Sequence, residues 1–128
     1  MKLITQAIIF HTGAGSELVS YFTYDPASPL HVEIAIPLVT MVTIPRETLM
    51  EGTNAPAAPH QDCYCVHICL HDAGPWWVDT VLPIAPSEGL HGYLPRLELG
   101  QFLAKTFTII PYGKEIPPVD WDGERPYP

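Results

Sequence analysis

The chain has 128 residues, 47% of them hydrophobic, which suits one domain with a modest core and leaves no room for a second domain of ordinary size. Its 6 Lys and Arg residues against 14 Asp and Glu residues give a net charge of −8, so backbone-driven binding of nucleic acid is a poor first hypothesis. The sequence contains no run of about 18 apolar residues, so no membrane-spanning helix is predicted. The opening residues 1–6 turn polar too soon for a signal peptide, so we expect a cytoplasmic protein.

Apolar runs and residue alternation predict five strands. The first two are joined by the turn at residues 13–16 and form a hairpin. The third alternates, with Val32, Ile34 and Ile36 on one face, which indicates a half-buried strand. The predicted strands cover residues 2–12, 17–24, 30–43, 62–71 and 76–84.

Two helices are predicted between and after these strands. Proline at the start, an acid soon after and glycine at the end predict a two-turn helix over residues 45–52. Apolar residues at i, i+3, i+4, i+7 and i+8 predict a longer helix over 95–107. Gly100 in its interior costs that helix about 1 kcal/mol relative to alanine.

The remaining segments complete an α+β layout. Residues 53–61 and 86–92 are predicted loops, and residues 116–128, rich in proline and acids, an extended tail after a single domain over 1–115. The order strand-strand-strand-helix-strand-strand-helix predicts an α+β fold with a mainly antiparallel sheet.

The fourth predicted strand carries the most reactive side chains. Its cysteines and histidines occupy alternate positions and therefore share one face of the strand. They are Cys63, Cys65, His67, Cys69 and His71. Alternate strand residues can supply ligands to zinc or copper, and the candidates are Cys65, His67, Cys69 and His71. Alternatively, the cysteines act as small hydrophobes and the histidines lie at a sheet surface or subunit contact. Since the chain has no Cys-x-x-Cys and no distant matching pair, we favour the second interpretation and predict no cofactor.

No catalytic constellation is recognisable in the sequence. A nucleophilic cysteine needs an activating base in an electropositive setting, and His67 and His71 would point parallel to Cys69 rather than towards it. The chain has no Gly-x-Ser-x-Gly elbow, no glycine-rich phosphate loop before a helix and no recognisable acid–base pair of carboxylates. We therefore expect a protein that is not an enzyme.

Four residues are predicted to contact a partner: Arg46, Glu47, Trp76 and Trp77. The two adjacent tryptophans would present one indole on each face of the fifth strand, and tryptophan is common at protein interfaces. Alternatively, one packs in the core and the other covers the sheet edge. Arg46 is either a partner contact or a member of an ion pair within the fold, and an exposed pair would contribute little to stability.

Four segments, in order, resemble the SsgA-like proteins, which are sporulation and cell-division regulators of filamentous actinobacteria. Residues 24–32, Tyr-Asp-Pro-Ala-Ser-Pro-Leu-His-Val, resemble the family's Tyr-Asp-x-x-Asp-Pro-Tyr-x-Val segment. Residues 44–52, Ile-Pro-Arg-Glu-Thr-Leu-Met-Glu-Gly, resemble its Phe-x-Arg-Asp-Leu-Leu-x-Glu-Gly helix. Residues 62–65, Asp-Cys-Tyr-Cys, fall where it has Gly-Asp-Val-x-Val, and residues 102–115 resemble its Phe-Leu-x-Arg-Thr-Tyr-x-Leu-Val-Pro-x-Gly-x-Glu helix end. The order and spacing fit over residues 17–115.

Several departures indicate a divergent member, from an actinobacterial phage or an accessory locus. Ser28 replaces the acid before Pro29, the tryptophan before the first helix is missing, and residues 53–61 lack the family's glycines. The Cys/His strand and the acidic proline tail have no counterpart in the family.

The resemblance implies a non-enzymatic adaptor in cell division and sporulation septation that acts by protein–protein contacts. Its implied partners are the tubulin-like division GTPase FtsZ or another SsgA-like protein, with recruitment to division septa. It also implies a fold similar to the whirly-type single-stranded nucleic-acid binders, assembled as a homotrimer. Two alternatives stay open, a metal-binding module on the strand at 63–71 and a single-stranded nucleic-acid binder on the sheet.

Overall fold

The computed structural model describes residues 3–54, 69–72, 74–85 and 88–115. Within them the elements follow in the order β1 (Ile4–Thr12), β2 (Glu17–Tyr24), β3 (His31–Ile36), β4 (Thr40–Pro45), α1 (Arg46–Asn54), β5 (Cys69–Asp72), β6 (Trp77–Ala85), β7 (Glu88–Pro95) and α2 (Arg96–Ile109). The described strands form one antiparallel sheet in the order β4-β3-β2-β1-β7-β6-β5. The predicted fold class, α+β with an antiparallel sheet, is confirmed.

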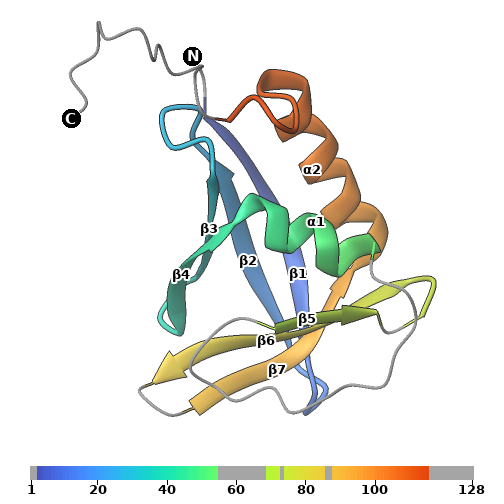
Figure 1. Ribbon diagram of the computed structural model, residues 1–128. Helices are drawn as coiled ribbons and strands as arrows, with labels where there is room; N and C mark the ends of the chain where they lie inside the picture. Colours follow the sequence, from blue (N-terminus) through green and yellow to red (C-terminus); the bar gives the residue numbers. More distant parts are fainter. Residues whose placement is uncertain (1–2, 55–68, 73, 86–87, 116–128) are drawn as a thin grey trace, which may run out of the picture.

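The sheet curls because β1 joins its two halves at one end only. This strand pairs with β2 along nearly its whole length, but with β7 only through its last two residues, His11 and Thr12. Figure 1 shows β1, β2 and β3 running steeply while β6 and β7 cross beneath them. On the other side of the curl, Thr40 Oγ1 in β4 donates a 2.6 Å hydrogen bond to the Pro83 carbonyl in β6. The curled sheet therefore has an inner face that the helices can fill.

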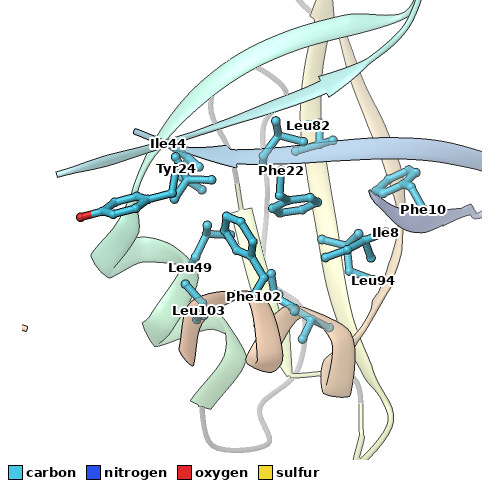
Figure 2. Close-up of a cluster of buried hydrophobic side chains, with 14 of the residues drawn as sticks. Ile8, Phe10, Phe22, Tyr24, Ile44, Leu49, Leu82, Leu94, Phe102 and Leu103 are labelled. Carbon is cyan, nitrogen blue, oxygen red and sulfur yellow. The ribbon is translucent and has the colours of Figure 1, made fainter. Parts of the chain in front are cut away.

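Even-numbered strand residues build that inner face, as the two-residue period of a strand requires. Phe22 of β2 meets Phe102 of α2 edge to face, with ring centroids 5.6 Å apart. Figure 2 shows side chains of both helices and of the sheet gathered in one cluster. The buried hydrophobic residues of that cluster are Ile8, Phe10, Phe22, Tyr24, Val32, Ile34, Ile36, Ile44, Leu49, Val78, Leu82, Leu94, Leu99, Phe102 and Leu103.

The predicted strand over 30–43 is in fact two strands, β3 and β4, joined by a tight turn. Leu38 in this turn has a φ of 64°, the left-handed region that glycine or asparagine normally occupies. Its side chain is fully exposed. Pro37, at the second position of this turn, was the available signal, but the position after it holds leucine rather than glycine or asparagine.

The predicted loop over 86–92 was also wrong, because residues 88–92 belong to β7. Gly92 suggested a loop, but its role is packing. A Cβ atom there would lie 2.4 Å from the His11 carbonyl oxygen and 2.6 Å from the Phe10 ring. Only glycine fits where β7 crosses the end of β1.

The other predicted boundaries agree closely where the structure describes them. α1 extends the first predicted helix to Asn54, which takes two residues from the predicted loop at 53–61, and α2 runs two residues beyond the second. β5 is the described part of the strand predicted over 62–71. Residues 55–61, 62–68 and the predicted tail at 116–128 lie outside the described residues. Neither described helix is long and apolar enough to cross a bilayer.

Candidate partner-binding groove

Arg96, the first residue of α2, ties three segments together through their backbones. Its guanidinium donates to the carbonyl oxygens of Thr53 at the end of α1, Gly74 before β6, and Trp77. The distances to Gly74 and Trp77 are 3.1 Å from Nη2. Its backbone N–H donates to the Trp76 carbonyl over 2.9 Å. The peptide backbone around Trp76 is therefore held in place from both sides.

A groove of about 450 Å³ lies beside Arg96 and the backbone carbonyl groups that it contacts. Two large apolar side chains at its margin, Trp76 and Leu97, are 72% and 69% exposed. The lining residues come from α1, from the segment before β6 and from the outward face of α2, and they are Thr53, Pro75, Trp76, Arg96, Leu97, Gly100, Gln101 and Ala104. Large apolar side chains gathered at a hollow commonly mark an interaction site.

Gly100 leaves the α2 backbone uncovered within this groove. A Cβ atom added there would meet no atom within 4 Å, so nothing in the described chain requires a glycine. Leu97, Gly100 and Ala104 are spaced at i, i+3 and i+7, which places them on one face of the helix. The buried residues Leu99 and Phe102 face the other way. Among the residues that the structure describes, no side chain therefore covers the α2 backbone at Gly100.

The two tryptophans that we predicted to contact a partner have different surroundings. Trp76 stands at the groove, whereas Trp77 is 37% exposed and packs among other aromatic rings. Its ring centroid lies 4.9 Å from that of His11 and 6.5 Å from that of Tyr93, both edge to face. Only Trp76 of the pair borders the groove.

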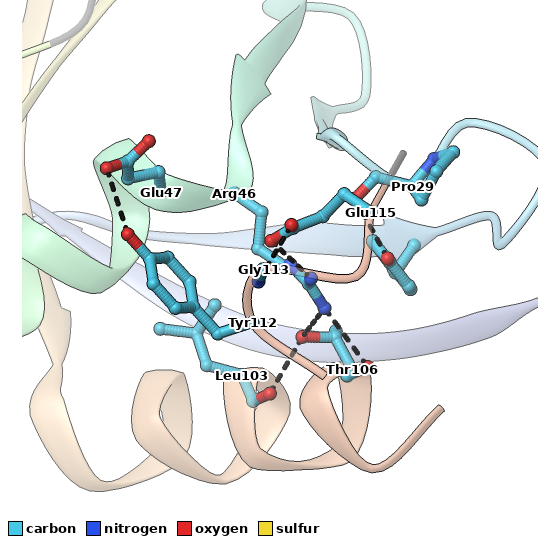
Figure 3. Close-up of polar contacts among 9 residues, drawn as sticks. Pro29, Arg46, Glu47, Leu103, Thr106, Tyr112, Gly113 and Glu115 are labelled. Atoms are coloured by element: carbon cyan, nitrogen blue, oxygen red, sulfur yellow. Dashed lines mark hydrogen bonds and ion pairs between the residues drawn. The ribbon is translucent and has the colours of Figure 1, made fainter. Parts of the chain in front are cut away.

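Arg46 lies inside the protein, with 1% of its surface exposed. Its Nη1 donates to the Thr106 carbonyl over 3.1 Å, and its Nη2 pairs with Glu115 Oε2 at 2.9 Å, as Figure 3 shows. The guanidinium carbon also lies 4.1 Å from the centre of the Phe107 ring. The second interpretation of Arg46, an ion pair within the fold, describes this position, so we assign Arg46 to the interior rather than to a partner surface.

Glu47 is exposed at the start of α1, one residue from Arg46 and at the opposite end of that helix from the groove. Its carboxylate accepts a 3.4 Å hydrogen bond from the Tyr112 hydroxyl (Figure 3). Both residues border a second, smaller hollow of about 330 Å³. The four predicted partner residues are therefore not brought together.

Three groups around Arg46, namely Glu115, Tyr112 and Tyr24, have pKa values shifted by their surroundings. The hydrogen bond from Arg46 lowers the pKa of the Glu115 carboxyl. The neighbouring Glu47 carboxylate raises the pKa of Tyr112, and burial raises that of Tyr24. All three shifts move away from neutrality, whereas a general acid or base needs a pKa close to the working pH.

The Cys/His strand is only partly described. Cys65 and His67 lie outside the described residues, and Cys69 and His71 are residues of β5. Among the side chains that the structure describes, no group of three or more His, Cys, Asp or Glu residues is placed to hold a metal ion.

Sequence reasoning missed the α2 side of the groove. Leu97, Gly100 and Ala104 lie on the face of α2 that a soluble helix normally fills with polar residues. The available signal was Gly100, an unfavourable residue in a helix interior with no turn or cap to justify it. Together with Leu97 on the same face, it could have identified this surface.

Two solved structures share this architecture, although no protein-family model and no curated protein sequence matches the chain. The first is SsgB of Streptomyces coelicolor, whose mutations are described as correlating with longitudinal cell division during sporulation. It superposes with a TM-score of 0.70 at 19% sequence identity, and the match covers 89% of this chain and 93% of SsgB. The second is an SsgA-like sporulation-specific cell division protein from Thermobifida fusca, with a TM-score of 0.65 at 19% identity, over 88% and 84% of the two chains. The chain has the SsgA-like fold.

Within this SsgA-like fold, the segments that carry the sequence resemblance meet at Arg46. The guanidinium comes from the segment at 44–52, and its acceptors Thr106 and Glu115 come from the segment at 102–115. Tyr24, from the segment at 24–32, lies with its ring centre 5.0 Å from the guanidinium carbon. The three sequence segments that resemble the SsgA-like proteins therefore meet in an internal contact of this chain.

Proposed function

We propose that this chain is a non-enzymatic adaptor in cell division and sporulation septation, and that it binds a division protein through the groove beside α2. The proposed partner is FtsZ or another SsgA-like protein, and the proposed working form is a homotrimer recruited to septa. The solved structures of the same fold support a role in cell division, because both are described as proteins of sporulation-linked division.

The observation that carries the binding mode is the groove with its uncovered glycine. Trp76 and Leu97 present large apolar areas on a backbone that Arg96 holds rigidly, so little ordering entropy is lost when a partner binds. Tryptophan is among the residues that most often dominate binding energy at interfaces. The absence of a side chain at Gly100 allows a partner's helix or strand to approach the α2 backbone closely.

The test is localisation of a fluorescent fusion in a sporulating actinobacterial host, together with a marker of the division ring. We expect the unmodified chain to form foci or ladders that coincide with the ring. The variant Trp76→Ala/Leu97→Ala should become diffuse at unchanged protein level, because truncating an interface hot spot weakens binding by more than about tenfold.

The matched control removes equally exposed apolar side chains elsewhere. Leu38 and Met41 are exposed by 107% and 67% on the turn and strand at the far edge of the sheet. The variant Leu38→Ala/Met41→Ala should keep its septal foci. Foci that survive in the groove variant, or that vanish equally in both variants, would contradict the groove as the partner site.

A further inference from the structure

The outward face of α2 carries an uncharged stripe that continues beyond the groove. Its four members, all exposed, are Leu97, Gln101, Ala104 and Thr108. Their spacing of four, three and four residues is that of the contact positions of a coiled coil, in which two helices pack along one seam. Thr108 donates its hydroxyl to the Ala104 carbonyl over 2.9 Å, so this polar group is satisfied within the helix. The stripe therefore has the spacing of a helix-pairing surface.

The surface offers large projecting side chains at one end and small residues further along. Trp76 and Leu97 are 72% and 69% exposed, and the Trp76 carbonyl accepts from the backbone N–H of Arg96, so both lie beside the first turn of α2. One and two turns further along are Gly100 and Ala104. In a two-fold contact both copies use the same patch, so a projection on one copy must meet a hollow on the other. Antiparallel α2 helices satisfy this condition, because the first turn of each then lies beside the third turn of the other.

The charges beside the stripe are self-complementary in the same antiparallel arrangement. Glu98 and Lys105 are seven residues apart, which puts them at the same angle around the helix. Gln6 of β1 accepts from the Lys105 ammonium over 3.1 Å and donates to the Glu98 carbonyl over 3.3 Å, so both residues border the same flank of α2. Antiparallel pairing brings these two flanks together in reverse order, with Glu98 of each copy facing Lys105 of the other.

α2 is also the element through which two copies of this acidic chain repel each other least. The chain has a net charge of −8. α2 nevertheless holds two basic residues, Arg96 and Lys105, against one acidic residue, Glu98. The described strands carry no Lys or Arg, so a contact through the sheet would bring acidic surfaces together.

We propose that the groove is occupied by a second copy of this chain, through an antiparallel, two-fold pairing of the α2 helices. The inference rests on the proposed function of the groove as a binding site, and it selects an SsgA-like protein, the chain itself, as the partner. Leu97 of each copy packs on Ala104 of the other, and two ion pairs between Glu98 and Lys105 fix the orientation. The pairing doubles the number of chains in the assembly, from one to two or from three to six.

The test is sedimentation velocity of the full untagged chain, at concentrations of about 1–200 μM. We expect the mass of the particle to double over this range. Glu98→Lys should weaken the doubling at least about fivefold, because two-fold symmetry turns two attractive pairs into two repulsive ones. The matched control Glu33→Lys makes the same change of charge at an exposed residue of β3 and should not weaken it.

A charge exchange tests the antiparallel orientation and separates it from misfolding. Lys105→Glu should weaken the doubling like Glu98→Lys. An equimolar mixture of these two variants should restore it, because each copy then supplies the charge that the other lacks. The double variant Glu98→Lys/Lys105→Glu should also pair like the unmodified chain. A mixture that associates no better than its components would overturn the antiparallel contact.

One more variant separates this inference from the proposed function. Leu97→Ala should weaken the doubling at least about tenfold, because Leu97 is the central apolar contact. If the pure chain does not double its mass, or if Leu97→Ala doubles like the unmodified chain, the pairing is overturned, although a loss of septal foci in Trp76→Ala/Leu97→Ala would still support the groove as a partner site. Doubling that depends on Leu97 and on the charge pair, with septal foci kept in that groove variant, would support the pairing and contradict the role of the groove in recruitment.

Discussion

The Arg46 side chain illustrates how one buried charge can organise a small protein. A charge removed from water costs several kcal/mol unless it is paired and hydrogen-bonded. Here Glu115 neutralises it, the Thr106 carbonyl accepts from it, and the Phe107 and Tyr24 rings cover its guanidinium. Because these acceptors lie at and beyond the end of α2, the arginine links the start of α1 to the C-terminal end of the described chain.

Replacing this arginine should therefore be costly. Arg46→Met keeps the volume but removes the cation that pairs with the Glu115 carboxylate and one of the two N–H donors to the Thr106 carbonyl, and we expect it to lower the free energy of unfolding by about 3 kcal/mol. Thermal and urea unfolding would measure it. The control Lys105→Met removes an exposed cation whose ammonium donates to Gln6 over 3.1 Å, and it should change stability by less than about 0.5 kcal/mol. Equal effects of the two variants would contradict the structural role of Arg46.

The same ion pair predicts a dependence of stability on pH. The pKa of Glu115 is lowered in the folded chain below the ordinary 4.5, with the hydrogen bond from Arg46 as the main cause. Its stabilisation is therefore complete above the ordinary pKa and disappears as the pH falls through the lowered one. The difference in unfolding free energy between the unmodified chain and Glu115→Gln should be full at neutral pH and vanish in acid. A difference that stays constant down to the lowered pKa would show that the pair does not form.

At the scale of elements, glycines in β7 and α2 have opposite roles. Gly92 sits where β7 crosses β1, with no room for another atom, whereas a Cβ atom on Gly100 in α2 would meet no described atom within 4 Å. The first is required by packing, and the second weakens its own helix. A pair of alanine substitutions tests both assignments.

Gly92→Ala should destabilise the fold by about 2–3 kcal/mol, because its Cβ would press against backbone and an aromatic ring that cannot easily move. Gly100→Ala should stabilise it by up to about 1 kcal/mol, since alanine favours the helix and its Cβ would meet no atom of the described residues. Urea unfolding of both variants gives the sign of each effect. If Gly100→Ala destabilised the fold, the groove floor would be more crowded than the structure shows.

The strands whose faces differ in polarity were the predictable ones. β1, β2 and the start of β3 alternate clearly, and α2 carries its apolar stripe at helical spacing. β7 was missed because Gly92, placed there by the approach of β1, imitates a loop residue. The split of β3 from β4 was missed because the turn uses Leu38 in a left-handed conformation. The groove joins α1, α2 and the segment before β6, so only its α2 side, through Leu97 and Gly100, had a local signal, and Trp76 was predicted as a partner contact for a different reason.

At the scale of the whole molecule, charge is distributed unevenly between helices and sheet. Within the described residues every Lys and Arg lies on α1, on α2 or just after α2, namely Arg46, Arg96, Lys105 and Lys114. The described strands carry none. Tyr21 and Trp77 are 41% and 37% exposed on the sheet, so rings for stacking exist without a positive groove beside them.

This distribution predicts that the sheet does not bind single-stranded nucleic acid. Binders of that kind combine aromatic stacking with Lys and Arg side chains that follow the phosphates, and a chain of net charge −8 would instead repel the backbone. A labelled oligothymidine should show no shift at about 50 mM salt, where phosphate-driven binding is strong, and a basic single-strand binding protein serves as the positive control. Binding that weakens steeply with added salt would instead reveal a cationic path along α2, and Lys105→Ala should then reduce the salt dependence by about one counterion.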